Sequence, residues 1–237
     1  MSAARANPVF VAIDTPDLEY ALSLAEQVRP YVGGLKLGLE FLSANGPDSI
    51  KMFGKFGLPL FADVKFHDIP NTVAGAVRAI ATQGIALVNV HAGGGAAMMK
   101  AALEAARAVN PATRVIAVTV LTSLGDDDLA AVGQVPPAAD QVLRLATLTR
   151  QCGLDGVVCS AHEIARLRTA LGPDFLLVVP GIRPAGSAVG DQRRVMGQAE
   201  ALRAGADILV IGRPITTAPD PAIAARDIAQ SLGLSAA

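Results

Sequence analysis

The segment L-F-A-D-V-K-F-H-D-I-P-N-T-V, residues 60–73, places three acidic and basic side chains in an otherwise apolar stretch. Residues 60–66 have the apolar content of a buried strand. Side chains alternate between the two faces of a strand, so Phe61, Asp63 and Lys65 share one face. A carboxylate and an ammonium on such a strand are costly to bury unless they pair. The segment therefore predicts an ion pair, structural or catalytic, with Asp68 just beyond it.

Outward from this strand, the chain alternates short β-rich runs with longer amphipathic segments rich in Ala and Leu. We predict strands at 9–14, 34–38, 60–66, 86–91, 115–121, 156–160, 175–180 and 207–212. We predict helices near 17–30, 45–56, 71–83, 95–109, 138–152, 161–171, 191–204 and 220–232. Because no linker divides this alternation, it predicts a single-domain α/β fold over residues 1–237, a (β/α)8 TIM barrel rather than a doubly wound open sheet.

The composition narrows the class of protein. The 237 residues carry a formal net charge of -1 with no basic run, no Trp and two Tyr, so no nucleic-acid partner is expected. The apolar runs are too short to span a bilayer, so no membrane partner is expected either. Cys152 and Cys159 match no zinc or redox spacing, and the N-terminus has no apolar leader. These features favour a reducing cytoplasm.

In a barrel of this kind, function sits where the strands end and the βα loops begin. Polar residues recur at the predicted strand ends, on the face opposite the aliphatic side chains: Asp14, Lys36, Asp63, Lys65, Asn89, His91, Thr122, Ser123, Arg183 and Arg213. An apolar barrel core does not need such residues. Their convergence at one rim favours the catalytic interpretation of the Asp63–Lys65 pair over the structural one.

The last two predicted strands end in arginines, Arg183 and Arg213, at the position where barrels commonly bind phosphate. Asp14 and Lys36 are suited to hold hydroxyl groups, and Thr122 and Ser123 could address a polar ring edge. We therefore expect a phosphorylated, sugar-like ligand across the barrel mouth. The small, Gly-bearing segment after Arg183 suggests a lid, from which Gln192 either reaches the ligand or begins the next helix.

Metal and nucleophile motifs are missing from the sequence. The three histidines lack metal-ligand spacing, and Asp126, Asp127 and Asp128 are interpreted as the cap and first turn of a helix. No nucleophile elbow is present. We expect no metal and no cofactor, so that the chemistry comes from aspartate, lysine and electrostatics.

Residues 63–72, D-V-K-F-H-D-I-P-N-T, resemble the D-x-K-x-x-D-I-x-x-T motif of the orotidine 5′-phosphate decarboxylase family. Other blocks agree in kind and order: A-I-D at 12–14, K-L-G at 36–38, L-T-S at 121–123, P-G-I-R at 180–183, D-Q-R-R at 191–194 and I-G-R-P at 211–214. The resemblance implies decarboxylation of orotidine 5′-monophosphate to uridine 5′-monophosphate and CO2, the last step of de novo UMP synthesis. It implies a homodimer whose active sites are shared across the interface, with no cofactor.

The resemblance also implies roles for individual residues. Lys65 would donate the proton, and Asp63 would lie near the substrate carboxylate. Asp68 and Thr72 would reach into the site of the neighbouring subunit, and Ile69 would also contact substrate. Asp14 and Lys36 would hold the ribose hydroxyls, and Thr122 and Ser123 would lie at the pyrimidine. The phosphate would be bound by Gln192, Gly212 and Arg213, and Arg183 belongs to the same loop region.

Two other interpretations stay open at this point. A magnesium-dependent sugar-phosphate lyase or decarboxylase of the same superfamily would share the D-x-K-x-x-D pattern. The I-P-N-T, L-T-S and D-Q-R-R blocks argue against it. A barrel that binds a phosphorylated ligand without chemistry would leave the inward-facing Lys65 unexplained.

Overall fold

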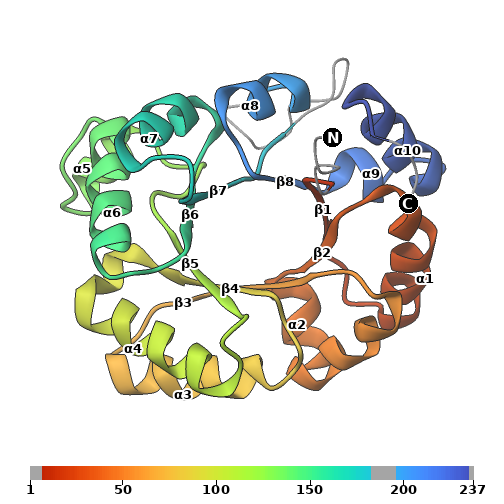
Figure 1. The fold of residues 1–237 in the computed structure, drawn as a ribbon, viewed down its shortest axis with the longest axis horizontal. Helices are drawn as coiled ribbons and strands as arrows, with labels where there is room; N and C mark the ends of the chain where they lie inside the picture. Colours follow the sequence, from red (N-terminus) through yellow and green to blue (C-terminus); the bar gives the residue numbers. More distant parts are fainter. Residues whose placement is uncertain (1–6, 183–195, 235–237) are drawn as a thin grey trace.

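The computed structural model describes residues 7–182 and 196–234, and its centre is a closed barrel of eight parallel strands in chain order (Figure 1). The strands are β1 (Val9–Ile13), β2 (Gly34–Leu37), β3 (Leu60–Phe66), β4 (Leu87–His91), β5 (Arg114–Val118), β6 (Gly156–Val158), β7 (Leu176–Val179) and β8 (Ile208–Ile211). Because β1 pairs with both β2 and β8, the sheet closes. The predicted barrel is confirmed, and the open sheet is excluded.

The strands divide their side chains between two cores. One face fills the interior of the barrel with a small apolar cluster of Phe10, Ala12, Phe61, Leu87, Ile116, Val178 and Val210. The other face, which includes Val11, Leu35, Leu37 and Ala62, packs in the larger core between the barrel and the surrounding helices. The faces predicted for the first three strands are therefore confirmed, and Lys36 lies opposite its two leucine neighbours.

The helices form the outer ring in Figure 1. They are α1 (Leu18–Val28), α2 (Leu39–Asn45), α3 (Pro70–Ala81), α4 (Gly95–Val109), α5 (Asp126–Ala131), α6 (Ala138–Gln151), α7 (Ile164–Leu171), α8 (Gln198–Ala204), α9 (Arg213–Thr216) and α10 (Pro221–Ser231). Side-chain caps begin two of them, because the carboxylates of Asp17 and Asp220 accept hydrogen bonds from the backbone N–H groups of Tyr20 and Ile223. No helix among the residues described could cross a membrane.

Several predicted boundaries differ from the structure. The segment expected as a helix at 45–56 is a 3-10 helix, Pro47–Phe56, preceded by the separate short helix α2. Gly46, at φ 71°, lies between them, and this left-handed conformation interrupts an α-helix. The strand expected at 115–121 ends at Val118, so Thr122 and Ser123 lie in a loop. Of the helix expected at 191–204, α8 begins at Gln198, and 191–195 lie outside the described residues.

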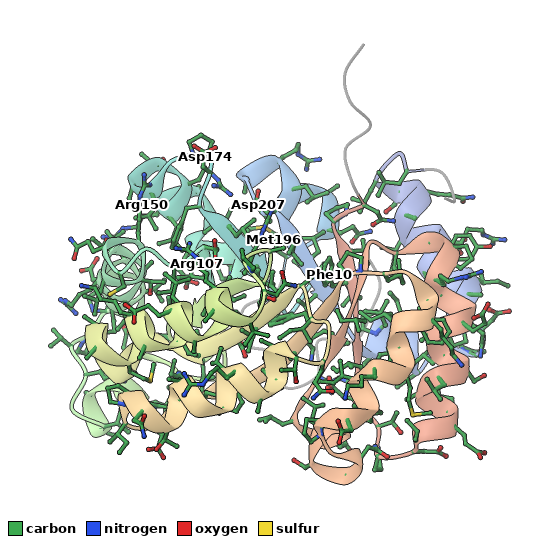
Figure 2. All side chains as sticks on the ribbon, turned by 60° about the horizontal axis from the view of Figure 1, so that its bottom comes forward. Phe10, Arg107, Arg150, Asp174, Met196 and Asp207 are labelled. Carbon is green, nitrogen blue, oxygen red and sulfur yellow. The ribbon has the colours of Figure 1, made fainter. Side chains whose placement is uncertain are left out.

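Two aspartate side chains form hydrogen bonds to the neighbouring strand at the amino-terminal end of the barrel. Asp155, just before β6, accepts a hydrogen bond from the backbone N–H of Val115 on β5. Asp207, just before β8, does the same for Leu177 on β7. Asp207 is labelled in Figure 2. These two carboxylates therefore support the pairing of β5 with β6 and of β7 with β8 at the ends where the strands begin.

Candidate active site

A cavity of about 480 Å³ opens at the carboxyl-terminal end of the barrel. Its floor is apolar and includes Phe61, Val158 and Val178, which are part of the barrel interior. Its polar lining contains seven of the residues singled out in the sequence: Asp14, Lys36, Asp63, Lys65, Thr122, Gly212 and Arg213. The cavity therefore brings together groups from both ends of the chain. Glu40, which carried no prediction, also lines it.

Four of these side chains form a chain of alternating charges across β1, β2 and β3. The Lys36 ammonium lies 3.2 Å from Asp14 Oδ1 and 3.1 Å from Asp63 Oδ2. The Lys65 ammonium lies 2.6 Å from Asp63 Oδ1. Lys36 is only 6% exposed, so its charge depends on these carboxylates. The predicted Asp63–Lys65 pair thus exists and is part of a larger network.

The network favours the charged forms of its two central members, Lys36 and Asp63. Burial works to raise the pKa of the Asp63 carboxyl, but the Lys36 and Lys65 ammoniums and hydrogen bonds from Lys65 and Asn89 outweigh it and lower that pKa. Burial works to lower the pKa of Lys36, yet Asp63 and Asp14 reverse this and raise it. A charged, preorganised environment therefore exists before any ligand enters.

The backbone of β3 is irregular where Lys65 enters the site. Lys65 has φ 52°, the one positive φ at a non-glycine position in the described part of the chain. Its backbone N–H donates to Asn89 Oδ1 over 2.7 Å, and Asn89 Nδ2 donates to Asp63 Oδ1 over 2.7 Å. Asn89 is fully buried. The sequence placed Asn89 at the inward end of a strand but gave it no role; its contacts depend on how β3 and β4 pair.

Gly38 leaves room for the network. A Cβ at this position would lie 1.9 Å from Asp14 Oδ1 and 2.8 Å from Lys36 Nζ. Any larger residue would therefore displace the carboxylate from the ammonium. This is a local physical reason for the glycine in K-L-G, residues 36–38.

The remaining predicted site residues lie elsewhere. Asp68, Ile69 and Thr72 are exposed around the start of α3 and do not line this cavity. The Asp68 carboxylate accepts a hydrogen bond from the neighbouring backbone N–H of Ile69. Ser123 is not among the lining residues, unlike Thr122. Arg183 and Gln192 lie outside the described residues.

Other polar groups that the sequence pointed out make structural contacts in the described part of the chain. The rings of His67 and His91 stack with centroids 5.3 Å apart beside β3 and β4. Asp126, Asp127 and Asp128 form the first turn of α5, as predicted, and Asp128 accepts a hydrogen bond from the Gly125 N–H. Within residues 7–182 and 196–234, no group of three or more His, Cys, Asp or Glu residues is arranged to hold a metal ion.

A closed parallel barrel with an ion-pair network in a cavity at the carboxyl ends of its strands is the architecture of a (β/α)8-barrel enzyme. The chain belongs to the orotidine 5′-phosphate decarboxylase / HUMPS family, whose match extends over residues 7–228. The resemblance recognised from residues 63–72 is thereby confirmed.

Individual relatives agree over nearly the whole chain. Orotidine 5′-phosphate decarboxylase of Rhodospirillum rubrum is 57% identical, with 97% of this chain and 95% of the relative covered. The enzyme of that name from Moorella thermoacetica is 54% identical, with 95% and 92% covered. A crystal structure of orotidine 5′-phosphate decarboxylase from Lactobacillus acidophilus has a TM-score of 0.84 at 38% identity, covering 95% of this chain and 99% of that one.

Proposed function

We propose that this chain is an orotidine 5′-phosphate decarboxylase, which converts orotidine 5′-monophosphate to uridine 5′-monophosphate and CO2. The observation that carries the proposal is the Lys36–Asp63–Lys65 network inside the cavity, in a chain 57% identical to a protein of that name. The alternating charges offer what a decarboxylation without a cofactor needs, a fixed cation where negative charge develops.

The positions of Asp63 and Lys65 support the following course of the reaction. The bond between ring carbon 6 and the carboxylate breaks, CO2 leaves, and the electron pair stays on carbon 6. The Lys65 ammonium stabilises this charge and donates a proton to it, which leaves uridine monophosphate. Asp63 lies beside the substrate carboxylate and holds Lys65 through the 2.6 Å contact. Because the donors are in place beforehand, little reorganisation is needed at the moment of reaction.

Substrate binding uses the rest of the lining. Asp14 and Lys36 hold the ribose hydroxyls, and Thr122 and Ser123 lie at the pyrimidine. The phosphate is bound at the ends of β7 and β8 by Gly212 and Arg213, with Gln192 and Arg183 from the intervening segment. The presence of Gly212 and Arg213 in the same cavity as Lys65 supports this arrangement. Binding energy from the remote phosphate can then be used at the reacting ring.

The functional unit that we propose is a homodimer, in which Asp68 and Thr72 complete the site of the partner and Ile69 contacts substrate. Large apolar side chains remain exposed near the barrel mouth, with Ile69 67% and Leu39 51% exposed. Burial of such groups against a second copy would stabilise a dimer. The two cysteines are free and buried, which fits a reducing cytoplasm as the location of the enzyme.

The test is the ultraviolet absorbance change of orotidine monophosphate with purified protein. Turnover in excess EDTA supports the proposal and removes the magnesium-dependent sugar-phosphate chemistry of the alternative. The variant Lys65→Ala should lose nearly all turnover while it remains folded. An inactive wild-type protein that is folded and dimeric would refute the proposal, and would leave the barrel that binds a phosphorylated ligand without chemistry.

A further inference from the structure

We propose that Asn89 is a positioning residue for the decarboxylation, which holds the Lys65 backbone and the Asp63 carboxylate in the reactive arrangement. The inference rests on the proposed function. Asn89 itself is fully buried and does not line the cavity, so it acts through its two neighbours on β3.

The pairing of β3 with β4 is interrupted at the place where Asn89 lies. Ala62 pairs with Val88 and Phe66 pairs with Val90, with a register shift between them. One β4 residue, Asn89, therefore faces the three β3 residues between Ala62 and Phe66. A regular ladder cannot supply partners for the extra backbone groups. The side chain of Asn89 does so, because its Oδ1 accepts the hydrogen bond of the Lys65 N–H at 2.7 Å.

This contact supports a conformation that lysine does not adopt readily. At φ 52°, the Lys65 backbone is left-handed, where a side chain crowds the following carbonyl. Such conformations persist only where the surrounding structure fixes them, and they concentrate at functional sites. The bulge and the left-handed turn together aim Lys65 Nζ at Asp63 Oδ1, 2.6 Å away.

The amide nitrogen of Asn89 fixes the second neighbour, Asp63. Asn89 Nδ2 donates to Asp63 Oδ1, the oxygen that also binds Lys65 Nζ, while Asp63 Oδ2 faces Lys36. A side chain at position 89 must therefore accept from one neighbour and donate to the other. Leucine has the same number and branching of side-chain heavy atoms and does neither. Aspartate keeps the shape and the acceptor, but when ionised it repels Asp63 instead of donating to it.

The test compares Asn89→Leu and Asn89→Asp with wild type in steady-state decarboxylation. For both variants at neutral pH we expect kcat to fall by about 100-fold or more, with KM changed less than about threefold, because the lost interactions act on the reacting groups and not on the phosphate. Thr113→Val is the matched control. It removes a buried hydrogen bond to Ile85 O between the start of β5 and the residues before β4, so it should leave both constants unchanged.

Asn89→Asp adds a readout that a purely structural role would not give. Once protonated, the introduced carboxyl group could donate to Asp63 and accept from the Lys65 N–H, as asparagine does. Relative to wild type, the kcat of Asn89→Asp should therefore recover at least about tenfold between about pH 7.5 and about pH 5.5. The charged groups around position 89 are Asp63 and Lys65 on β3, Lys36 on β2 and His91 on β4. Asn89→Leu should show no such recovery.

The outcomes separate the inference from the function. If wild type turns over the substrate but Asn89→Leu stays within about threefold of its kcat, the inference is wrong. It is equally wrong if a crystal structure of Asn89→Leu keeps Lys65 left-handed with its contact to Asp63. If the Leu variant does not fold, the isosteric Asp variant carries the kinetic test. If wild type itself is inactive, the proposed function fails, and the crystal structure still decides whether Asn89 positions Lys65.

Discussion

Lys36 illustrates how a single residue can carry charge inside an apolar barrel. Its ammonium is almost fully buried, and two carboxylates from neighbouring strands lie 3.2 Å and 3.1 Å away. Burial alone would favour the neutral amine, whereas the paired carboxylates favour the ammonium. Asp63 also contacts Lys65, so one carboxylate holds the ammonium groups of two neighbouring strands.

His91 provides a pH-dependent test at the same scale. Burial, then the charges of His67 and Lys65, lower its pKa from the ordinary value of 6.5, against the smaller opposite effect of Asp63. The unfolded chain therefore binds a proton at His91 more readily than the folded chain does. The free energy of unfolding should accordingly decrease as the pH falls below 6.5.

The measurement is chemical denaturation of wild type and His91→Gln between about pH 7.5 and about pH 5.5 at one fixed protein concentration. Carboxylates that titrate are common to both proteins, so the difference between the two curves isolates His91. The stability of His91→Gln should depend less on pH in this range. Two parallel curves would show that the environment of His91 does not disfavour its protonation.

At the scale of elements, Arg168 on α7 joins the segments that lead into β7 and β8. Its guanidinium donates to the backbone carbonyls of Gly172, Pro173, Phe175 and Gly205 and pairs with Asp207 at 2.6 Å. Asp207 in turn accepts from the Leu177 N–H. Removal of the guanidinium leaves several partly buried acceptors without this partner. The loss of one partner costs more stability than the loss of both, because the remaining group stays desolvated.

We expect Arg168→Ala to lower the free energy of unfolding by about 2–4 kcal/mol. Arg168→Lys should recover little, because an ammonium cannot span the same set of acceptors. Arg166→Ala is the matched control on the same helix. Its 2.6 Å contact with Asp140 is exposed, so its loss should cost less than about 1 kcal/mol. Equal destabilisation by the two alanine variants in urea denaturation would contradict this role of Arg168.

At the scale of the whole molecule, the barrel separates stability from chemistry. The contacts of Asp155, Arg168 and Asp207 lie where strands begin, and the ion-pair network lies where they end. Asp68, two residues before α3, is exposed, does not line the cavity and makes no ion pair within the described residues. A shared active site would require this arrangement of residues 63–72. Asp63 and Lys65 face the cavity of their own chain, and Asp68 is exposed where a partner chain could meet it.

Subunit mixing tests that arrangement. Lys65→Ala and Asp68→Ala homodimers should each be nearly inactive. After exchange, each mixed dimer should contain one intact site, with Lys65 from one chain and Asp68 from the other. Random exchange should therefore restore about one quarter of wild-type activity, because about half of the dimers are mixed and half of their sites are intact.

The control mixture is Lys65→Ala with Asp63→Ala. Both residues belong to the same strand of the same chain, so neither site of that mixed dimer is intact and no activity should return. Absence of recovery in the first mixture, despite exchange demonstrated by mass spectrometry of differently labelled subunits, would mean that Asp68 does not serve the partner.

The order of the strands, the inward faces of the first three and seven residues of the cavity lining could be predicted from the sequence. These features are local, since the two-residue period of a strand is visible in residues 9–14 or 60–66 without knowledge of the fold. The same local character made the triple aspartate at 126–128 recognisable as a helix start. It did not reveal the short helices α2 and α9, because segments of so few residues take their conformation from packing and turns.

How Lys65 is held depends instead on tertiary structure. The register shift between β3 and β4, the left-handed backbone of Lys65 and the double contact of Asn89 arise from the meeting of two strands 24 residues apart. The closed barrel likewise brought Arg213 into the same cavity as Lys65, while it left Asp68 and Thr72 on the surface. Pairing between distant segments sets these positions. A local pattern of residues does not predict which backbone N–H will donate a hydrogen bond to a side chain on another strand.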